Sequence, residues 1–358
     1  MKRLVLLAVL STGCGPGPTT TCPLTLTGGY PATTFMTASA NERALNDRAE
    51  SLVAAMDGAA AQPPVRTTRP ALDMLWTTGS PSLSSLTAAP FGPVMGEVFT
   101  AFIASQDQTW TPANPPNGGG LYGKYVFSDR GVDVSEFVEK GLFGALAFNE
   151  AVKRLPNATT PESVDQLVAL YGATPTFPQD DKAPEGKDNF TAKYAKRRTP
   201  PGMSGSYTII RDAFITARLA ATSSSCAAER TQALDTVRQE WERVLSATVV
   251  FYVNASVSKL QDANADVAKK AGALHDLGEA IGMLHGLKAV PSASRKITDA
   301  QLDSVLTALK APTFGTATVF RLVTDVPPDL DGLLTANTQL ATIYGFSADD
   351  MARFRTSY

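Results

Sequence analysis

Three glycines spaced every fourth residue constrain the fold of this chain more than any other feature. Gly278, Gly282 and Gly286 lie in the segment from Ala271 to Lys288, which has the pattern of a helix. Glycines at that spacing remove the side chains along one stripe and let a second helix approach closely. Each Gly costs about 1 kcal/mol of helix propensity relative to Ala, so the repeat indicates a packing or site requirement. The alternative is a local kink, and the segment is too polar to span a membrane.

Both histidines of the chain lie in this segment. On a helix, His275 and Glu279 share one face, roughly 40° apart around the axis. His285 would lie about 15 Å further along a straight helix, so the two histidines cannot bind one ion unless the helix breaks.

A metal bound at His275 would therefore use Glu279 and oxygen ligands from other helices. One nitrogen with several oxygens favours iron, manganese or calcium over structural zinc or copper. Haem with His275 as its axial ligand is a second interpretation. A third is a His–Glu hydrogen bond that only fastens the bundle.

The start of the chain predicts export. Basic residues, a short apolar run and small residues up to position 13 form a signal peptide, 1–13, that is too short to cross a bilayer. Cys14 resembles the lipidated cysteine of a bacterial lipobox, although Ser11 stands where Leu is usual. Gly15 replaces the Asp that retains such proteins at the inner membrane. We therefore expect an outer-membrane lipoprotein facing the periplasm or the cell surface, with 14–29 as a flexible tether.

Charge and cysteine content argue against several classes of protein. The formal net charge is −2 and the sequence has no basic patch, which argues against nucleic-acid binding. If Cys14 is lipidated, Cys22 and Cys226 remain. They could form one disulfide in an oxidising compartment, but they make neither a disulfide scaffold nor a zinc knuckle.

Apolar residues at helical spacing between proline-rich loops predict an all-α bundle. The predicted domain, 30–358, has two helical halves, roughly 30–172 and 207–358, joined by a polar loop at 173–206. Trp241 lies in an apolar stripe and is expected in the core. Helices are predicted at 94–105, 133–155, 160–172, 207–221, 227–254, 271–288, 330–344 and 348–355. Helix-end signals are capping boxes at 39–42 and 298–301, Thr160 before Pro161, and Gly172.

The sequence contains partial matches to common catalytic motifs, but the residues around them do not fit those motifs. Residues 118–124 have the spacing of a phosphate-binding loop, but Tyr125 replaces the magnesium-binding Ser or Thr and prolines replace the preceding strand. The sequence HDLGE is not the HExxH of zinc proteases, and no G-x-S-x-G elbow exists.

Five motifs follow one another along most of the chain. They are Tyr30-Pro31-Ala32-Thr33, FVEKGLFGA at 137–145, Asp212-Ala213-Phe214 with Arg218, EWERV at 240–244 and HDLGE at 275–279. This succession resembles a bacterial lipoprotein family known only as a domain of unknown function, in which the last motif usually reads His-x-Leu-Ser-Glu. That family is similar to imelysin-like proteins, which are exported, paired helical bundles with a His-x-x-Glu motif associated with iron or haem acquisition.

The resemblance implies an imelysin-like bundle that binds iron, haem or another metal in envelope nutrient uptake, rather than an enzyme. His275 and Glu279 would be ligands. Relatives tend to carry His-His-Trp-Asp-Glu near 162–166, where only Asp165 remains here, and Asp165 is a candidate third ligand. Arg218 is a candidate partner of a haem propionate or carboxylate ligand, or part of a structural salt bridge.

Two alternatives use the same residues. A metal-dependent peptidase or other hydrolase would need an open coordination position and a general base. A scaffold would dock an outer-membrane partner through the glycine-lined helix or the long loops, with the His–Glu pair purely structural.

Overall fold

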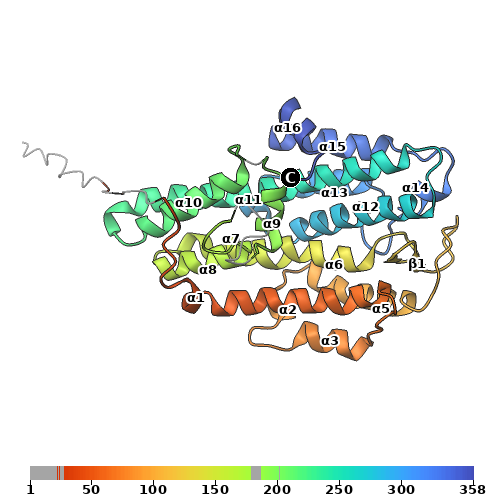
Figure 1. Cartoon of the computed structure of the whole chain (residues 1–358), viewed down its shortest axis with the longest axis horizontal. Coiled ribbons are helices and arrows are strands. Elements are labelled where there is room, and N and C mark those ends of the chain that lie inside the picture. Colours follow the sequence, from red (N-terminus) through yellow and green to blue (C-terminus); the bar gives the residue numbers. More distant parts are fainter. Residues whose placement is uncertain (1–21, 23, 25–27, 179–186, 201) are drawn as a thin grey trace, which may run out of the picture.

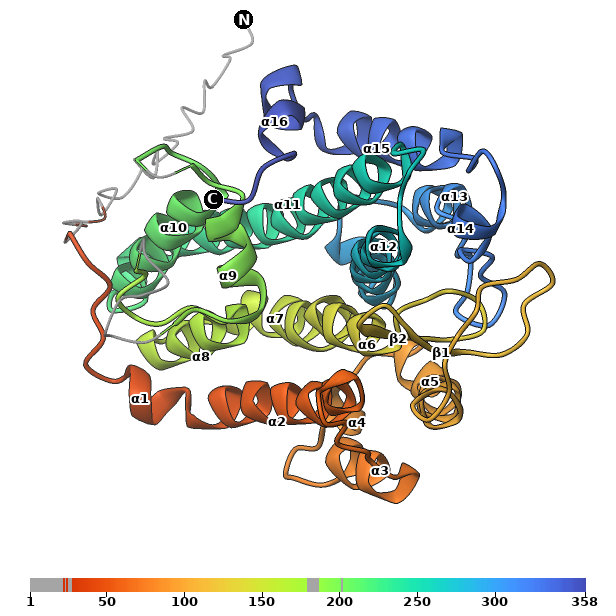
Figure 2. The same cartoon turned by 45° about the vertical axis from the view of Figure 1, so that its right-hand side comes forward.

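The computed structural model describes residues 22, 24, 28–178, 187–200 and 202–358. Cys14, the signal peptide at 1–13 and most of the tether at 14–29 lie outside the described residues, and their predictions stay open. Figures 1 and 2 show helices α1 to α5 as one outer layer, with α6 to α8 beside it. Helices α10 to α12 form the next layer, and α15 and α16 lie on the far side.

The described chain is predominantly α-helical, as predicted, and its elements have the following bounds. The first layer contains α1 (Phe35–Ala38), α2 (Ala40–Asp57), α3 (Arg69–Thr77), α4 (Leu83–Leu86) and α5 (Phe91–Ser105). The middle contains β1 (Gly120–Tyr122), β2 (Tyr125–Phe127), α6 (Val134–Leu142), a π-helix (Phe143–Phe148), α7 (Asn149–Arg154) and α8 (Pro161–Tyr171). The remainder contains α9 (Phe190–Arg197), α10 (Ser206–Ala220), α11 (Ala227–Leu260), α12 (Val267–Lys288), α13 (Asp299–Ala308), α14 (Arg321–Thr324), α15 (Asp331–Tyr344) and α16 (Ala348–Arg353). Short 3₁₀ turns lie at Gly58–Ala60, Leu155–Asn157, Ser224–Cys226 and Ser292–Ser294.

Three of the four predicted helix-end signals are confirmed, whereas α5 and α12 begin three and four residues earlier than predicted and α11 ends six residues later. Thr298 and Gln301 form the expected capping box, and α8 starts after Thr160 and ends at Gly172, whose φ of 88° suits glycine. The capping box at 39–42 is wrong. The Ser39 hydroxyl donates to the carbonyl of Phe35, and Glu42 pairs with an arginine of α7.

The predicted helix at 133–155 is interrupted by the π-helix at Phe143–Phe148, for which the sequence carries no recognised signal. Ala145 lies in this segment, and its carbonyl accepts a hydrogen bond from the backbone N–H of Ala88 at 2.9 Å. A Cβ on Gly144 would lie 2.4 Å from the backbone of Gly286, so the segment contacts the C-terminal part of α12 directly. The wider turn is therefore held by partners on two other elements.

The predicted polar loop at 173–206 contains helix α9. Six of the eight residues of this helix are buried, and its apolar residues Phe190, Ala192, Tyr194 and Ala195 belong to the core. Its charged residues made the segment look like a loop in the sequence. Buried apolar residues form one continuous cluster from Tyr30 to Phe354. The two predicted halves therefore share a core within the described residues.

The segment at 118–124 belongs to a β-hairpin. Strands β1 and β2 pair antiparallel, with Leu121 opposite Val126, and Gly123 turns between them with a φ of 63°. The glycines lead into this hairpin and do not connect a strand to a helix, so the segment does not have the structure of a phosphate-binding loop, as predicted.

Packing and cross-links bring distant segments together. Trp241 is fully buried, as predicted, and its indole N–H donates to Thr191 of α9 at 2.9 Å. Cys22 and Cys226 form a disulfide that ties the N-terminal segment to the start of α11. Among the described residues, no helix combines the length and the apolar character that crossing a membrane requires.

Candidate functional site

The glycine stripe of α12 places this helix directly against α6. A Cβ on Gly278 would lie 2.8 Å from Cβ of Asp133, and one on Gly282 would lie 2.8 Å from the carbonyl of Phe137. On Gly286 it would lie 2.1 Å from the carbonyl of Gly141. The predicted close helix approach is therefore confirmed, and α6 is the partner helix.

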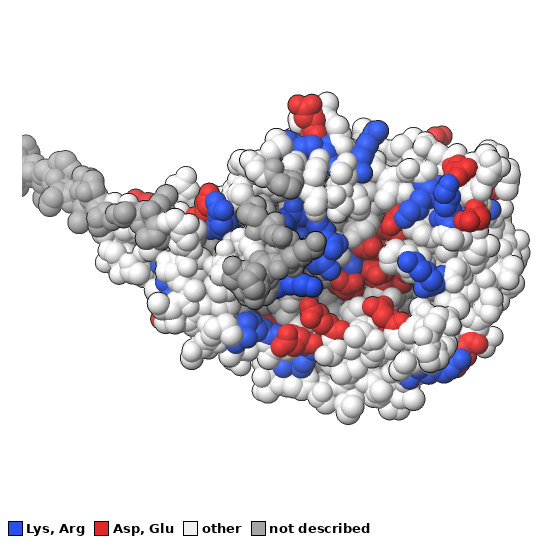
Figure 3. Space-filling view, in the orientation of Figure 1, with Lys and Arg blue, Asp and Glu red and all other residues white. Residues whose placement is uncertain are grey.

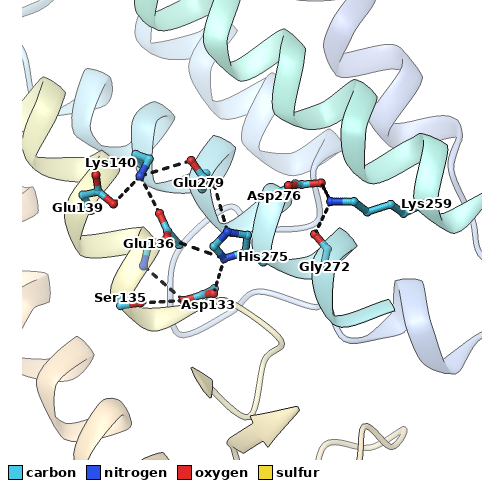
Figure 4. Close-up of polar contacts among 10 residues, drawn as sticks. All are labelled: Asp133, Ser135, Glu136, Glu139, Lys140, Lys259, Gly272, His275, Asp276 and Glu279. Atoms are coloured by element: carbon cyan, nitrogen blue, oxygen red, sulfur yellow. Dashed lines mark hydrogen bonds and ion pairs between the residues drawn. The ribbon is translucent and has the colours of Figure 1, made fainter. Parts of the chain in front are cut away.

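Two rows of polar side chains lie beside this contact, one on each helix. Asp133, Glu136 and Lys140 recur at helical spacing along the start of α6, and His275 and Glu279 recur along α12. Figure 4 shows the side chains of Glu136, Lys140 and Glu279 converging beside the imidazole of His275. We call these five residues the His275 cluster.

Asp133 orients the histidine. Its Oδ1 accepts from the backbone N–H of Glu136 at 3.3 Å, which caps α6, and His275 Nδ1 donates to its Oδ2 at 2.9 Å. Tyr125 of β2 stacks on the imidazole with ring centroids 4.0 Å apart and planes 14° apart. The ring is thereby held with Nε2 directed at Glu279, whose Oε1 is 3.4 Å away.

Glu136, His275 and Glu279 can together hold a metal ion. One donor atom from each residue lies within 4.8 Å of the others. The Glu279 side chain is 8% exposed, and the Tyr252 hydroxyl of α11 donates a hydrogen bond to its carboxylate. Its nearest cationic atom is Lys140 Nζ at 3.3 Å. The predicted pair of His275 and Glu279 thus lies together, with Glu136 as a third donor.

The electrostatics of the cluster favour positive charge. Burial lowers the pKa of His275, but Asp133, Glu136 and Glu279 outweigh burial and raise it to about 9. Burial raises the pKa of Glu279 above its ordinary value, and Lys140 opposes this shift. Figure 3 shows acidic side chains gathered in a hollow of the molecular face, over α6 as seen in Figure 1.

His285 has no part in this cluster. Helix α12 is unbroken from Val267 to Lys288, so the two histidines lie apart as predicted. Burial lowers the pKa of His285 to about 4, against the opposing effect of its acceptor. The neutral ring donates from Nε2 to the carbonyl of Ala311 at 3.1 Å.

Asp165 and Arg218 lie away from the His275 cluster, which corrects the predicted third ligand. Asp165 is fully buried on α8, and Arg218 Nε of α10 donates to its Oδ1 at 2.8 Å. Tyr30 and Thr34 donate to the two oxygens of the same carboxylate at 2.5 and 2.6 Å. Both oxygens are thus satisfied by protein groups that fasten the N-terminal segment to α8 and α10, at the opposite end of the bundle from α6 (Figure 1). Arg218 thus forms a structural salt bridge with Asp165, which was one of the two roles predicted for it.

Asp276 also points away from the cluster, toward α11. Lys259 Nζ contacts its carboxylate and donates to the carbonyl of Gly272 at 3.2 Å. Of the acidic residues in the HDLGE motif, only Glu279 therefore belongs to the cluster.

Four residues of the site were not identified from the sequence: Tyr125, Asp133, Glu136 and Lys140. A local signal existed for three of them. Asp133 followed by Glu136 is a helix-start pattern, and Glu136 and Lys140 are four residues apart and share one face of the helix. No sequence signal places Tyr125 over His275.

The fold and the cluster define an all-α protein with a carboxylate–histidine site between two helices. A family model described as "Domain of unknown function (DUF4856)" matches residues 169–325. This match includes α12 with His275 and Glu279 but not α6. Comparisons with curated proteins and with solved structures give no match. The resemblance to imelysin-like proteins stays a prediction.

Proposed function

We propose that this protein is an exported binding protein for a divalent metal ion, of the iron and manganese class. Glu136, His275 and Glu279 are its protein ligands. The observation that carries the proposal is the convergence of these three donors around a histidine whose Nδ1 is held by Asp133. A metal-binding histidine usually donates a hydrogen bond from its other ring nitrogen to a carboxylate. This hydrogen bond orients the ring and makes Nε2 a stronger ligand for the metal.

The chemistry of the donor set supports this choice of metal. One imidazole and two carboxylates are hard donors suited to iron or manganese, whereas structural zinc favours four nitrogen or sulfur ligands. Three protein donors are fewer than such ions commonly bind, so water or a chelating ligand would complete the coordination.

Haem fits this site less well. One face of the His275 ring is covered by Tyr125. The neighbours of its two nitrogens are the carboxylates of Asp133 and Glu136 at Nδ1 and of Glu279 at Nε2, rather than apolar walls. The neighbouring pocket of about 250 Å³ is lined in part by Phe143, Phe190 and Tyr194, and His275 does not line it. Arg218, the predicted propionate partner, is committed to Asp165.

The proposed envelope location rests on the signal peptide and the lipobox-like Cys14. The disulfide between Cys22 and Cys226 supports it, because such bonds persist in oxidising compartments. An outer-membrane uptake partner would then receive or deliver the metal.

Elemental analysis and Mn²⁺ titration of the purified protein test the binding site. His275→Gln and Glu279→Gln should each lose stoichiometric metal while the protein stays helical by circular dichroism. Asp276→Asn is the matched control, since this neighbouring carboxylate contacts Lys259 instead. It should retain metal. A wild-type protein that binds neither iron nor manganese, with His275→Gln merely less stable, would make the cluster a structural ion network.

A further inference from the structure

Lys140 already occupies the position of a counter-ion in the His275 cluster. Its ammonium lies 2.7 Å from Glu136 Oε2, 2.5 Å from Glu139 Oε2 and 3.3 Å from Glu279 Oε2. The side chain is only 3% exposed. A buried cation among three carboxylates offsets their mutual repulsion and keeps them close together.

Two of these carboxylates are also proposed metal ligands. A divalent ion bound by Glu136 and Glu279 would therefore lie within a few ångströms of the Lys140 ammonium. Like charges at that separation in a buried site repel strongly. The ammonium and the metal ion cannot both stay there at low energy.

In its present position the ammonium also contacts two aromatic rings, which are not proposed ligands. Lys140 Nζ lies 5.7 Å from the ring centroid of Phe143 and 5.4 Å from that of Tyr194, which are cation–π contacts. Glu139, Phe143 and Tyr194 also line the pocket of about 250 Å³ beside the cluster. The flexible four-carbon stem of lysine would allow its ammonium to move away from Glu136 and Glu279 and still stay near Glu139, Phe143 and Tyr194.

We propose that Lys140 is a built-in competitor for the metal site, and this inference rests on the proposed function. Without metal, the ammonium holds Glu136 and Glu279 in their binding positions. A divalent ion displaces it toward the pocket wall formed by Glu139, Phe143 and Tyr194. A monovalent ion brings no more charge than the ammonium that it must displace, so Lys140 also selects for divalent ions.

The test compares Mn²⁺ binding and thermal unfolding of the full-length wild type and of Lys140→Met. The variant should bind Mn²⁺ at least tenfold more tightly than the wild type. Without metal it should unfold at a lower temperature, because three carboxylates are left without their counter-ion, and saturating Mn²⁺ should remove this difference. Na⁺ at high concentration should weaken Mn²⁺ binding more in Lys140→Met than in the wild type.

Lys153→Met is the control for the substitution. Lys153 pairs with Glu150 on α7, at 2.7 Å and outside the cluster, so its loss should leave the Mn²⁺ affinity unchanged. Lys140→Arg keeps the positive charge and should therefore bind Mn²⁺ as weakly as the wild type does.

The outcomes separate the two proposals. If the wild type binds Mn²⁺ and Lys140→Met binds it equally or more weakly, the competitor role of Lys140 is overturned and the metal site stands. If neither protein binds Mn²⁺ or Fe²⁺, the metal site itself is overturned. If Lys140→Met is unfolded without metal, Mn²⁺ should restore its fold and that of Lys140→Gln. If Mn²⁺ restores the fold of neither variant, the competitor role of Lys140 is overturned.

Discussion

His275 Nδ1 donates to Asp133 Oδ2 at 2.9 Å across the contact between α12 and α6, two positions 142 residues apart in the chain. The same carboxylate caps α6 through its other oxygen. One side chain therefore starts the helix that carries Glu136 and Lys140 and also aims the histidine at Glu279. The start of α6 and the geometry of the cluster depend on a single residue.

Asp133→Asn separates these two roles, because Asn still caps a helix but carries no charge. We expect the pKa of His275 to fall from about 9 toward its ordinary value. We also expect metal affinity to fall by about 10- to 100-fold, as for other residues that orient a metal-binding histidine. NMR titration of the histidine and Mn²⁺ titration measure the two effects. An unchanged His275 pKa would show that Asp133 is not its dominant partner.

Stability of the metal-free protein should fall at alkaline pH. The pKa of His275 is raised to about 9 in the folded state, so the stability it contributes is complete below about 6.5. This contribution is lost as pH rises through 9, and it is on the order of 3 kcal/mol. The raised pKa of Glu279 acts in the same direction. Urea unfolding in a chelator between pH 6 and 10 should show this loss in the wild type and a flatter profile in His275→Gln.

His285 should produce the opposite dependence on the acid side. Burial lowers its pKa to about 4 in the folded state, so its contribution is present above about 6.5 and is lost as pH falls toward 4. His285→Asn has no such titration and should lose less stability than the wild type between pH 7 and 5. Equal losses in both proteins over this range would contradict the prediction.

The glycine stripe gives a prediction with an internal control. In Gly286→Ala the new Cβ would lie 2.1 Å from the carbonyl of Gly141, so we expect about 1–3 kcal/mol of destabilisation by overpacking. Gly272→Ala lies on the same helix, and its Cβ would meet only Lys259, at 3.5 Å and beyond. It should be neutral or gain up to about 1 kcal/mol from helix propensity. Thermal unfolding compares the two, and equal effects would mean that the helices can separate without cost.

Removing the charge of Asp165 should destabilise the fold without affecting the proposed metal site. Asp165→Asn leaves the guanidinium of Arg218, 7% exposed, without its buried partner, a change that costs about 3–5 kcal/mol. Asp212→Asn is the control, because Asp212 is an exposed partner of Arg211 and such pairs contribute at most about 1 kcal/mol. Both variants should bind Mn²⁺ like the wild type at a temperature where they are folded. Weaker Mn²⁺ binding by folded Asp165→Asn alone would return Asp165 to the ligand set.

The sequence alone determined the features that depend on neighbours within a few residues. Helical periodicity and capping residues predicted α8 and α10 to within one residue at each end, and they predicted the starts of α11 and α13. Helix α11 continues to Leu260, six residues beyond its predicted end. The four-residue spacing of the glycines predicted close helix contact, and the same spacing placed His275 and Glu279 on one face. Local patterns were misleading at two places. The Ser39 hydroxyl donates to the carbonyl of Phe35, four residues earlier, instead of capping α2, and the apolar residues of α9 are buried in the core that distant segments form.

Only the tertiary structure decided which residues meet His275. Asp133, Glu136 and Tyr125 come from α6 and a hairpin, and their side chains reach the imidazole because α6 packs on the glycine stripe of α12. The same packing of distant segments places Asp165 on Arg218 and not on the histidine. Periodicity assigns a face to each helix, but it does not name the helix that covers that face. This choice depends on how the whole core packs, and it converts a His–Glu pair into a candidate metal centre.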